Sequence, residues 1–238
     1  MDNSQDSTKI DPLTLWFNTP DSDTLCRLGG NGVLHPSQLY AIKKYIPKGS
    51  KNKFKKAWSL LDYGCGSGTT LEALEKDGWD IEQPWGWKGD IIYQGVDIIP
   101  KNIRWCGMQW PRRKWEVNLS LHKIDQPDKS WDIVYSRHVV DHMESFEKAL
   151  DEHKRVAKKL VIIVLWTGLI DGDEHQIKNI VDHRGTPEEK IYPNEYTNNY
   201  SRKLVKQYLE QDLEWELLEL NENVGGNQVI VLRRRDGS

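Results

Sequence analysis

The sequence predicts an α/β protein built on one doubly wound, seven-stranded and mostly parallel sheet that ends in an antiparallel β-hairpin. From Ala57 onward, short apolar runs alternate with amphipathic helical stretches, which is the pattern of a parallel sheet covered by helices. The run from Leu160 to Trp166 has no polar residue and indicates a central strand buried on both faces. Near the C-terminus, two strand-like runs flank Gly225 and Gly226, which is typical of a hairpin turn.

The elements are expected in a regular order along the chain. Residues 1–56 are expected to form a polar tail and a capping helix, and residues 57–238 the main domain. The capping helix is predicted to begin near Ser37, because serine is a favoured N-cap, and to bury Leu39, Ile42 and Ile46. Strands are predicted at residues 58–63, 91–97, 117–122, 132–136, 160–166, 215–220 and 228–233. Helices are predicted through Leu71 and Glu75, from Pro100, over Glu144 to Lys158 and over Ser201 to Asp212.

The composition narrows the class of protein. A length of 238 residues suits one domain, and a formal charge of −3 lacks the basic field of a polyanion-binding protein, although nucleic acid is not excluded. The cysteines, Cys26, Cys65 and Cys106, are odd in number and form no CxxC pair, which argues against a disulfide framework and a structural zinc site. The polar N-terminus and the short apolar runs predict a soluble, cytoplasmic protein without a membrane span; the oligomeric state stays open.

The most informative segment runs from Asp62 to Thr69 and contains three glycines after a strand and before a helix. Such glycines let a ligand approach the bare backbone at the N-terminus of the helix. A dinucleotide fingerprint needs glycine at position 69, so Thr69 disfavours a nicotinamide-dependent oxidoreductase. Asp62 and Asp97 both end strands; either is a polar cap or a ligand contact, and their joint position relative to the glycines favours ligand contact.

Three segments resemble the class I S-adenosylmethionine-dependent methyltransferases, which are Rossmann-like, and in particular methyltransferase domains of types 11 and 25. They are Asp62-Tyr63-Gly64-Cys65-Gly66-Ser67-Gly68, Gly95-Val96-Asp97-Ile98 and Asp128 to Ser136, and the resemblance extends over about residues 57–235. It implies S-adenosylmethionine as cofactor, with Asp97 accepting from the ribose hydroxyls, Ile98 against the adenine and Asp125 at its amine. The cofactor-binding residues implied are Asp62, Gly64, Cys65, Gly66, Gly68, Asp97, Ile98, Asp125 and Ser136.

Two features depart from that family's pattern. Gly64 and Asp97 are 97 − 64 = 33 positions apart, against roughly 20 in an uninterrupted unit, which indicates an insertion at about residues 80–90. Lys158 and Lys159 stand where the family often has glycines before its fifth strand. Six of the eleven tryptophans fall between Trp79 and Trp115; they either pack the insertion onto the sheet or form an aromatic wall for a flat acceptor.

The acceptor side is expected just past the fourth strand and in the long polar stretch of residues 167–200. His138 and His142, four residues apart in a predicted helical segment, are candidate catalytic bases; the alternatives are ordinary helix residues or a zinc pair, for which no third ligand stands out, so no metal is expected. The polar stretch is interpreted as an acceptor lid or a solvated loop. Its tentative substrate residues are His175, Tyr196 and Tyr200.

The resemblance implies an enzyme that transfers a methyl group by in-line displacement to an oxygen or nitrogen nucleophile. Ser136-Arg137-His138-Val139 lacks the Asn/Asp-Pro-Pro-aromatic motif of amine and amide methylation, and no cysteine follows proline as in cytosine-C5 enzymes. We therefore expect a small-molecule acceptor. The alternatives are an RNA or protein methyltransferase and a cofactor-binding subunit without activity. Arg233-Arg234-Arg235 is interpreted as a solvated end rather than a nucleic-acid clamp.

Overall fold

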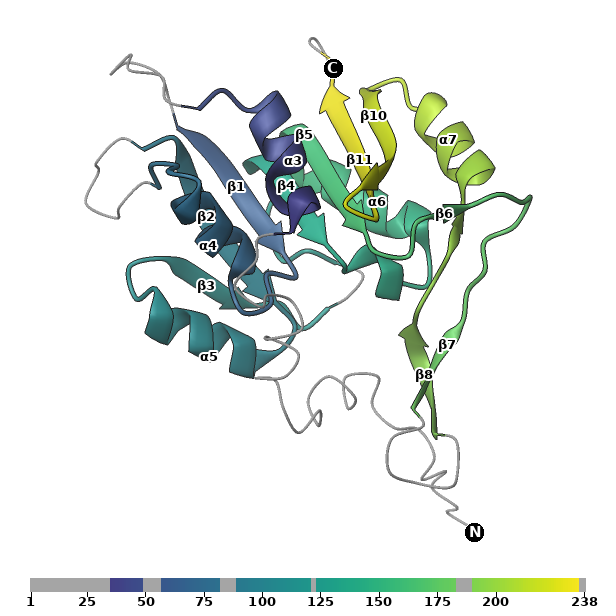
Figure 1. Ribbon diagram of the computed structural model, residues 1–238, viewed down its shortest axis with the longest axis horizontal. Coiled ribbons are helices and arrows are strands. Elements are labelled where there is room, and N and C mark those ends of the chain that lie inside the picture. The colour runs from purple at the N-terminus through teal and green to yellow at the C-terminus, as the bar shows by residue number, and fades with distance from the viewer. Residues whose placement is uncertain (1–34, 49–56, 82–88, 121–122, 183–189, 236–238) are drawn as a thin grey trace.

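The computed structural model describes residues 35–48, 57–81, 89–120, 123–182 and 190–235, and this part of the chain folds around one seven-stranded sheet (Figure 1). The strand order is β10-β11-β5-β4-β1-β2-β3, which confirms the predicted doubly wound α/β fold. The strands of this sheet are β1 (Trp58–Tyr63), β2 (Ile91–Asp97), β3 (Lys114–Val117), β4 (Trp131–Arg137), β5 (Ala157–Leu165), β10 (Trp215–Val224) and β11 (Asn227–Arg234).

Five of these strands run parallel, and the C-terminal two close the sheet as an antiparallel hairpin. β1 lies between β2 and β4, with Asp62 opposite Gly95 on one side and Tyr135 on the other. β11 pairs antiparallel with β5 and with β10. Between β10 and β11, Gly225 and Gly226 have φ values of +64° and +89°, which only glycine adopts without strain. Because β11 begins opposite the end of β5, the hairpin turn lies at the edge of the sheet where the parallel strands end.

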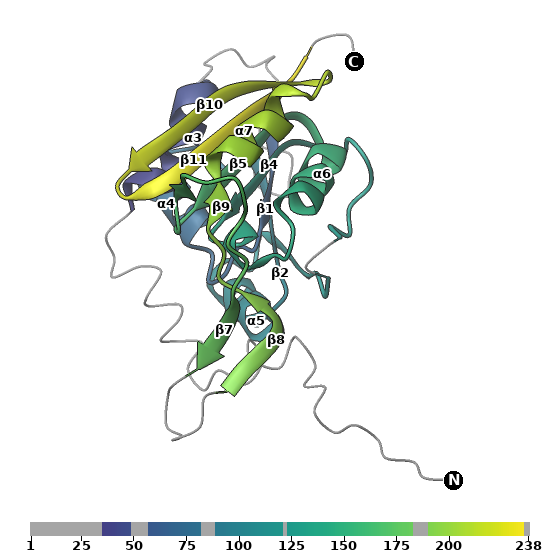
Figure 2. The ribbon, with the colours of Figure 1, turned by 90° about the vertical axis from the view of Figure 1, so that its right-hand side faces the viewer.

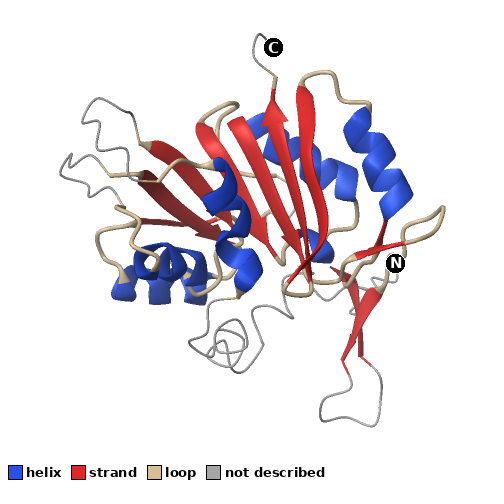
Figure 3. Ribbon diagram, turned by 45° about the horizontal axis from the view of Figure 1, so that its top comes forward, coloured by secondary structure: helices blue, strands red, loops and turns tan. Residues whose placement is uncertain are grey.

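Helices cover both faces of the sheet (Figure 3). On one face, α3 (Pro36–Tyr45) and α4 (Thr69–Lys76) bury side chains such as Ile42 and Leu74 against apolar residues of the strands. On the other, α6 (Phe146–Val156) and α7 (Arg202–Glu210) bury Phe146 and Val205. A fifth helix, α5 (Pro100–Gln109), follows β2. The capping helix predicted for the N-terminal region thus shares its core with the main domain.

Capping residues explain where the helices begin. His35, rather than Ser37, is the N-cap of α3: its Nδ1 accepts from the backbone N–H of Ser37, and Pro36 occupies the first helical position. Ser145 caps α6 by accepting from the N–H of Lys148, and Ser201 caps α7 in the same way. The sequence prediction placed the start of α3 two residues late because histidine is a rarer cap than serine.

Three predicted boundaries were wrong. The third strand covers residues 114–117 instead of 117–122. The helix predicted to reach Lys158 ends at Val156, and β5 begins directly at Ala157, so the two lysines expected in a turn lie within a strand. After β4 the predicted helix is reduced to one 3₁₀ turn, η1 (Val140–His142). His138 and His142 therefore do not share a helical face.

The long polar stretch is more ordered than its sequence indicated. It contains β6 (Leu169–Ile170), β7 (Asn179–Asp182), β8 (Lys190–Tyr196) and β9 (Tyr200–Ser201). β7 and β8 form an antiparallel arm that extends beyond the sheet on the side where the parallel strands end (Figures 1 and 2). These strands could not be predicted because their sequences lack an alternation of apolar and polar residues. A two-stranded hairpin needs little buried apolar surface, so it does not require that alternation.

Buried hydrogen bonds fasten the base of this arm to η1. The Tyr200 hydroxyl lies 2.7 Å from the carbonyl oxygens of both Val140 and Met143 and donates toward them. Asn198 donates to the same Met143 carbonyl from its side chain, and its backbone N–H donates to the carbonyl of Asp141 over 2.9 Å. The arm is thus anchored to the turn that follows β4. None of the helices in the described ranges combines the length and apolar character of a membrane-spanning segment.

Candidate functional site

The glycine turn is fastened to the end of β2 by its backbone. The N–H groups of Gly64 and Cys65 both donate to the carbonyl of Val96, over 2.8 and 3.0 Å. Gly64 has a φ of +75°, and a Cβ there would lie 2.1 Å from Cγ2 of Val139, which packs over the turn from the β4 side. Gly64 is therefore required both by its backbone conformation and by a close neighbour.

The middle of the turn leaves space for a ligand. A Cβ built on Gly66 would meet no atom within 4 Å. The thiols of Cys65 and Cys106 are buried and contact the Gly66 carbonyl oxygen, with Sγ to O distances of 3.8 and 3.4 Å. Burial raises the pKa of the Cys65 thiol, so this side chain stays protonated and only its backbone faces the turn.

Asp97, the last residue of β2, faces the glycine turn and is held by three donors. Its carboxylate accepts from the N–H of Gly66 and of Ile99, both over 2.8 Å, and from Nδ2 of Asn102 over 3.3 Å. Burial raises the pKa of Asp97, and these hydrogen bonds oppose that rise. A carboxylate offers about four acceptor positions, so three donors leave room for a ligand hydroxyl.

Asp62 lies beneath the turn and faces the side of the sheet covered by α3 and α4. It is 1% exposed, and its Oδ2 accepts from the Tyr93 hydroxyl over 2.6 Å. Burial raises the pKa of Asp62 to about 7, against hydrogen bonds from Tyr93 and Thr70 that lower it. The Asp62 carboxyl is thus buried beneath the glycine turn, and its charge changes near neutral pH.

The loop after β3 carries Asp125 toward the same edge. The backbone N–H of Asn118 donates to the carbonyl of Asp97, and the Asn118 side chain accepts from the Asp125 N–H over 2.7 Å. The Asn118 amide also donates to the carbonyls of Ser120 and Lys123. Asp125 itself is exposed. One asparagine therefore connects the predicted adenine contact to the predicted ribose contact.

At the end of β4, the two predicted bases have different surroundings. His138 has a φ of +57°, and its Nε2 lies 3.0 Å from the amide nitrogen of Asn227, the first residue of β11. Because that amide nitrogen only donates, Nε2 is assigned as the acceptor. Burial, with smaller contributions from Arg137, His35 and His142, lowers the pKa of His138 to about 3.

His142 lies in η1 beside Trp166, with ring centroids 6.4 Å apart. Trp166 is 49% exposed and follows β5, so it presents an aromatic surface near the end of β4. Ser136, in contrast, points into the core, where its hydroxyl bonds Nε2 of His153 over 3.0 Å. Only the backbone of Ser136 is left to face the edge of the sheet.

Two of the three tentative substrate residues use their polar atoms in hydrogen bonds within the protein. Tyr200 is fully buried in the anchor of the arm. Nδ1 of His175 accepts from the backbone N–H of Ser201 over 2.9 Å, and its Nε2 lies 3.1 Å from Glu147. The side chain of Tyr196 lies outside what the structure describes. The side chains of His175 and Tyr200 are therefore both engaged in contacts within the protein.

Two of the tryptophans, Trp110 and Trp115, pack against the glycine turn and β2. A Cβ on Gly68 would lie 2.7 Å from the ring of Trp110, and one on Gly95 would lie 2.3 Å from the ring of Trp115. Trp79 is 4% exposed, whereas Trp105 is 43% exposed. Trp85 and Trp87 lie outside the described residues. Trp110 thus packs against Gly68 at the start of α4, and Trp115 packs against Gly95 in β2.

Sequence reasoning missed several polar residues of this edge. Asn102 contacts Asp97, Tyr93 contacts Asp62, and Asn227 joins His138 to Ser37, to whose Oγ it donates over 2.8 Å. Asn102 carried a signal, since it lies two residues after the helix-opening Pro100. Asn227 carried none, because its position depends on the packing of the hairpin turn on α3. Within the described residues, no three side chains of His, Cys, Asp or Glu gather to hold a metal ion.

Comparison with known proteins supports this geometry. Residues 61–165, from β1 to β5, match the family model described as "Methyltransferase domain". Ajmaline N-methyltransferase from Rauvolfia serpentina is 28% identical over 116 residues, which make up 47% of this chain and 36% of that enzyme. The chain therefore matches only about a third of the length of that relative.

Solved structures share the fold at low identity. A SAM dependent methyltransferase from Aquifex aeolicus superposes with a TM-score of 0.52 and 18% identity, covering 90% of this chain and 99% of that one. Magnesium protoporphyrin IX methyltransferase from Synechocystis PCC 6803, solved with bound SAH, gives 0.59 and 12%, covering 92% and 97%.

The residues present fit the cofactor of this family: an open cradle at Gly66, a carboxylate with acceptor capacity at Asp97, and strand ends that converge on both. Residues 61–165 thus match a methyltransferase domain, and the described residues share the fold of solved S-adenosylmethionine-dependent methyltransferases.

Proposed function

We propose that this protein transfers the methyl group of S-adenosylmethionine by in-line displacement to an oxygen or nitrogen nucleophile on a small molecule. The observation that carries the proposal is the arrangement of Asp97 opposite the open Gly66 cradle, beside the turn that follows β4. The cofactor site and the acceptor side are thereby adjacent, as in-line transfer requires.

In this proposal the residues of the chain bind and orient. Asp97 accepts from the ribose hydroxyls, Ile98 and Asp125 border the adenine, and the glycine turn receives the rest of the cofactor. When bound, S-adenosylmethionine supplies a methyl group that is already activated. Catalysis then needs alignment of the nucleophile and, for some acceptors, removal of a proton.

Of the two histidines, His142 is the better candidate for the base that removes that proton. The lone pair on Nε2 of His138 is used by the Asn227 amide, and burial keeps the pKa of His138 at about 3. A base with so low a pKa holds an abstracted proton poorly at neutral pH. We therefore assign His138 a structural role at the hairpin turn and His142, beside Trp166, the role of base where one is needed.

A small acceptor is supported by two further observations. The formal charge of −3 gives no basic field for RNA, and the exposed Trp166 offers a flat apolar surface on the acceptor side. A nitrogen nucleophile is supported by the name of the relative from Rauvolfia serpentina, which is an N-methyltransferase. RNA or protein methylation, and a cofactor-binding subunit without activity, remain as outcomes of the test.

The test is release of S-adenosylhomocysteine when the purified protein and S-adenosylmethionine are incubated with separate acceptor pools. The pools are small amines and phenols, total RNA, and a protein extract, with the Asp97→Ala variant as the matched control. We expect turnover with the small-molecule pool, lost in the control. Turnover on RNA or protein alone would contradict the acceptor class, and tight cofactor binding without turnover on any pool would contradict enzymatic function.

Once an acceptor is found, the two histidines are compared directly. His142→Gln is expected to lower kcat/KM by about 10²-fold or more for an acceptor that must lose a proton. His138→Gln keeps a polar partner for Asn227 and is expected to change kcat/KM by less than about threefold. The reverse ranking would contradict the assignment.

A further inference from the structure

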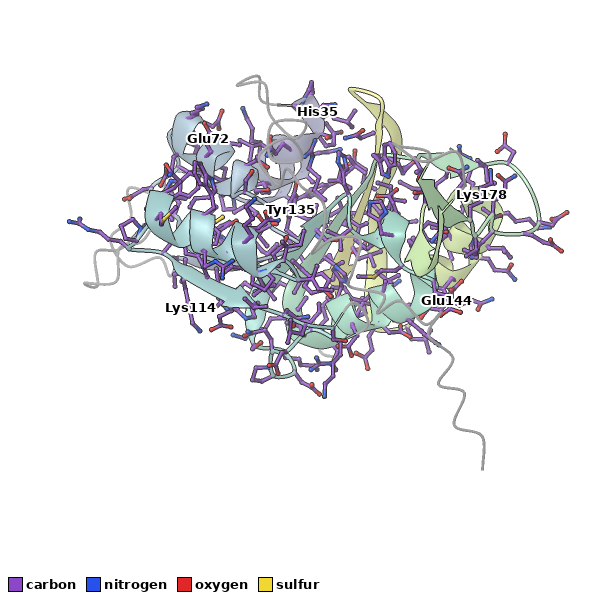
Figure 4. The ribbon with its side chains drawn as sticks, turned by 90° about the horizontal axis from the view of Figure 1, so that it is seen from below. His35, Glu72, Lys114, Tyr135, Glu144 and Lys178 are labelled. Carbon is purple, nitrogen blue, oxygen red and sulfur yellow. The ribbon has the colours of Figure 1, made fainter. Side chains whose placement is uncertain are left out.

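Arg137 is the last residue of β4, the strand that lies between β1 and β5 at the centre of the sheet. It pairs with Val164 of β5, and the chain turns immediately after it at His138. Side chains alternate along a strand, so Arg137 lies on the same face as Tyr135, whose hydroxyl donates to the Gln38 carbonyl of α3. Figure 4, which looks onto this edge, has Tyr135 and His35 on the α3 side of the sheet.

The guanidinium of Arg137 has no acceptor among the described residues. Its Nε is buried and makes no hydrogen bond there. The two terminal nitrogens also lack a partner in this part of the chain but are not among its enclosed atoms, so they are open to solvent. Arginine remains charged in proteins. A half-buried cation without a counter-ion is costly unless an anion binds to it.

The surrounding side chains do not neutralise this charge. Asp62 is a nearby carboxyl, but no ion pair joins it to Arg137, and burial raises the pKa of Asp62 to about 7, so it is only partly ionised at neutral pH. His35 and His138 are close enough to Arg137 for its charge to act on their pKa values. Burial is the main cause that lowers the pKa of each, and the charge of Arg137 adds to it, so both histidines are neutral at physiological pH.

The geometry of the Arg137 guanidinium favours one kind of ligand. Nε–H and the adjacent terminal N–H of a guanidinium form a planar fork that matches the two oxygens of a carboxylate. A carboxylate bound side-on would satisfy the buried Nε and neutralise the charge together. Arg137 ends β4 two residues before Val139, which packs on Gly64, so the fork belongs to the strand end that borders the glycine turn.

We propose that Arg137 binds a carboxylate at this edge, either the α-carboxylate of S-adenosylmethionine or a carboxylate on the acceptor. The proposal rests on the proposed function, because it places that carboxylate in the same site. It makes Arg137 a binding and specificity residue of the methyltransferase.

Calorimetric titration of the full-length protein distinguishes the two sources. S-adenosylhomocysteine carries the α-carboxylate, and 5′-deoxy-5′-methylthioadenosine lacks the whole amino-acid part. Arg137→Met is expected to weaken S-adenosylhomocysteine about 10–100-fold and 5′-deoxy-5′-methylthioadenosine by less than about twofold if the carboxylate belongs to the cofactor. Arg137→Lys keeps the charge but loses the fork, so its affinity for S-adenosylhomocysteine is expected to lie between those of wild type and Arg137→Met. Arg112→Met, an exposed arginine before β3, is the matched control.

The second arm uses benzoate and uncharged benzamide, titrated into the protein loaded with S-adenosylhomocysteine. If the carboxylate belongs to the acceptor, wild type binds benzoate but not benzamide, and Arg137→Met loses benzoate while its S-adenosylhomocysteine affinity is unchanged. Equal S-adenosylhomocysteine affinity in wild type and Arg137→Met, with no benzoate binding that depends on Arg137, overturns the proposal. A folded wild-type protein that binds no S-adenosylhomocysteine overturns the proposed function itself.

Discussion

Replacing Asp62 by asparagine should make the protein more stable at alkaline than at acidic pH, relative to wild type. In the folded protein, burial raises the pKa of Asp62 from 3.8 to about 7. A carboxyl whose folded pKa is raised binds its proton more tightly in the folded state. Its contribution to stability is therefore complete below pH 3.8 and is lost as the pH rises through about 7. Asparagine fills the same space and does not titrate.

The magnitude follows from the size of the shift. A rise of about three pH units, at 1.36 kcal/mol each, corresponds to about 4 kcal/mol of lost stability once Asp62 is fully ionised. At pH 5 only about 2 kcal/mol of this has been lost, because pH 5 lies only about one unit above the unfolded pKa of 3.8. The difference in unfolding free energy between Asp62→Asn and wild type is thus expected to grow by about 2 kcal/mol from pH 5 to pH 8.

Urea unfolding of the cofactor-free protein, followed by tryptophan fluorescence at pH 5, 6, 7 and 8, measures this difference. Asp132→Asn is the matched control, because hydrogen bonds from Ser59 and Lys159 outweigh burial and lower the pKa of Asp132. Asp132 is ionised in both states across that range, so its difference from wild type should not depend on pH. Parallel profiles for Asp62→Asn and wild type would show that the pKa of Asp62 is not raised in the folded protein.

Two further substitutions test the packing around the site. Gly64→Ala places a Cβ 2.1 Å from Cγ2 of Val139 at a φ of +75°, and should destabilise the protein by about 2 kcal/mol or more in thermal unfolding, whereas Gly107→Ala, with open space, should not. An unchanged melting temperature for Gly64→Ala would mean that the turn repacks freely. Ser201→Ala removes both the cap of α7 and a 2.6 Å bond to the Gly172 carbonyl. It should cost about 1–2 kcal/mol, measured by urea unfolding, and a loss below about 0.3 kcal/mol would contradict the capping role.

Much of the sheet could be predicted from the sequence, because its strands are short apolar runs bounded by glycine and helical patterns. Trp58–Tyr63 and Ile91–Asp97 were predicted to the residue. Boundaries failed where two elements meet without a turn, as at Val156 and Ala157. There the apolar pattern continues across the junction, and only the packing of α6 and β5 decides where the helix ends.

The same distinction, between local sequence patterns and contacts that depend on packing, applies to the candidate site. The glycine turn and Asp97 could be predicted as cofactor contacts because each lies in a short motif at the end of a strand. Arg137, Asn227 and the buried state of Tyr200 could not be predicted, since each depends on contacts between distant segments: β4 with α3, the hairpin turn with His138, and the arm with η1. Sequence periodicity carries no information about such contacts.

The account depends most on Asp97 holding the cofactor, and the direct test is calorimetric titration of S-adenosylhomocysteine into wild type and Asp97→Ala. Asp97 is 7% exposed and offers the acceptor capacity that ribose hydroxyls require. We predict binding to wild type and a loss of affinity of about 10–100-fold in Asp97→Ala, the effect of removing a charged acceptor from buried donors. Equal dissociation constants for the two proteins, both folded, would contradict the placement of the cofactor at this edge.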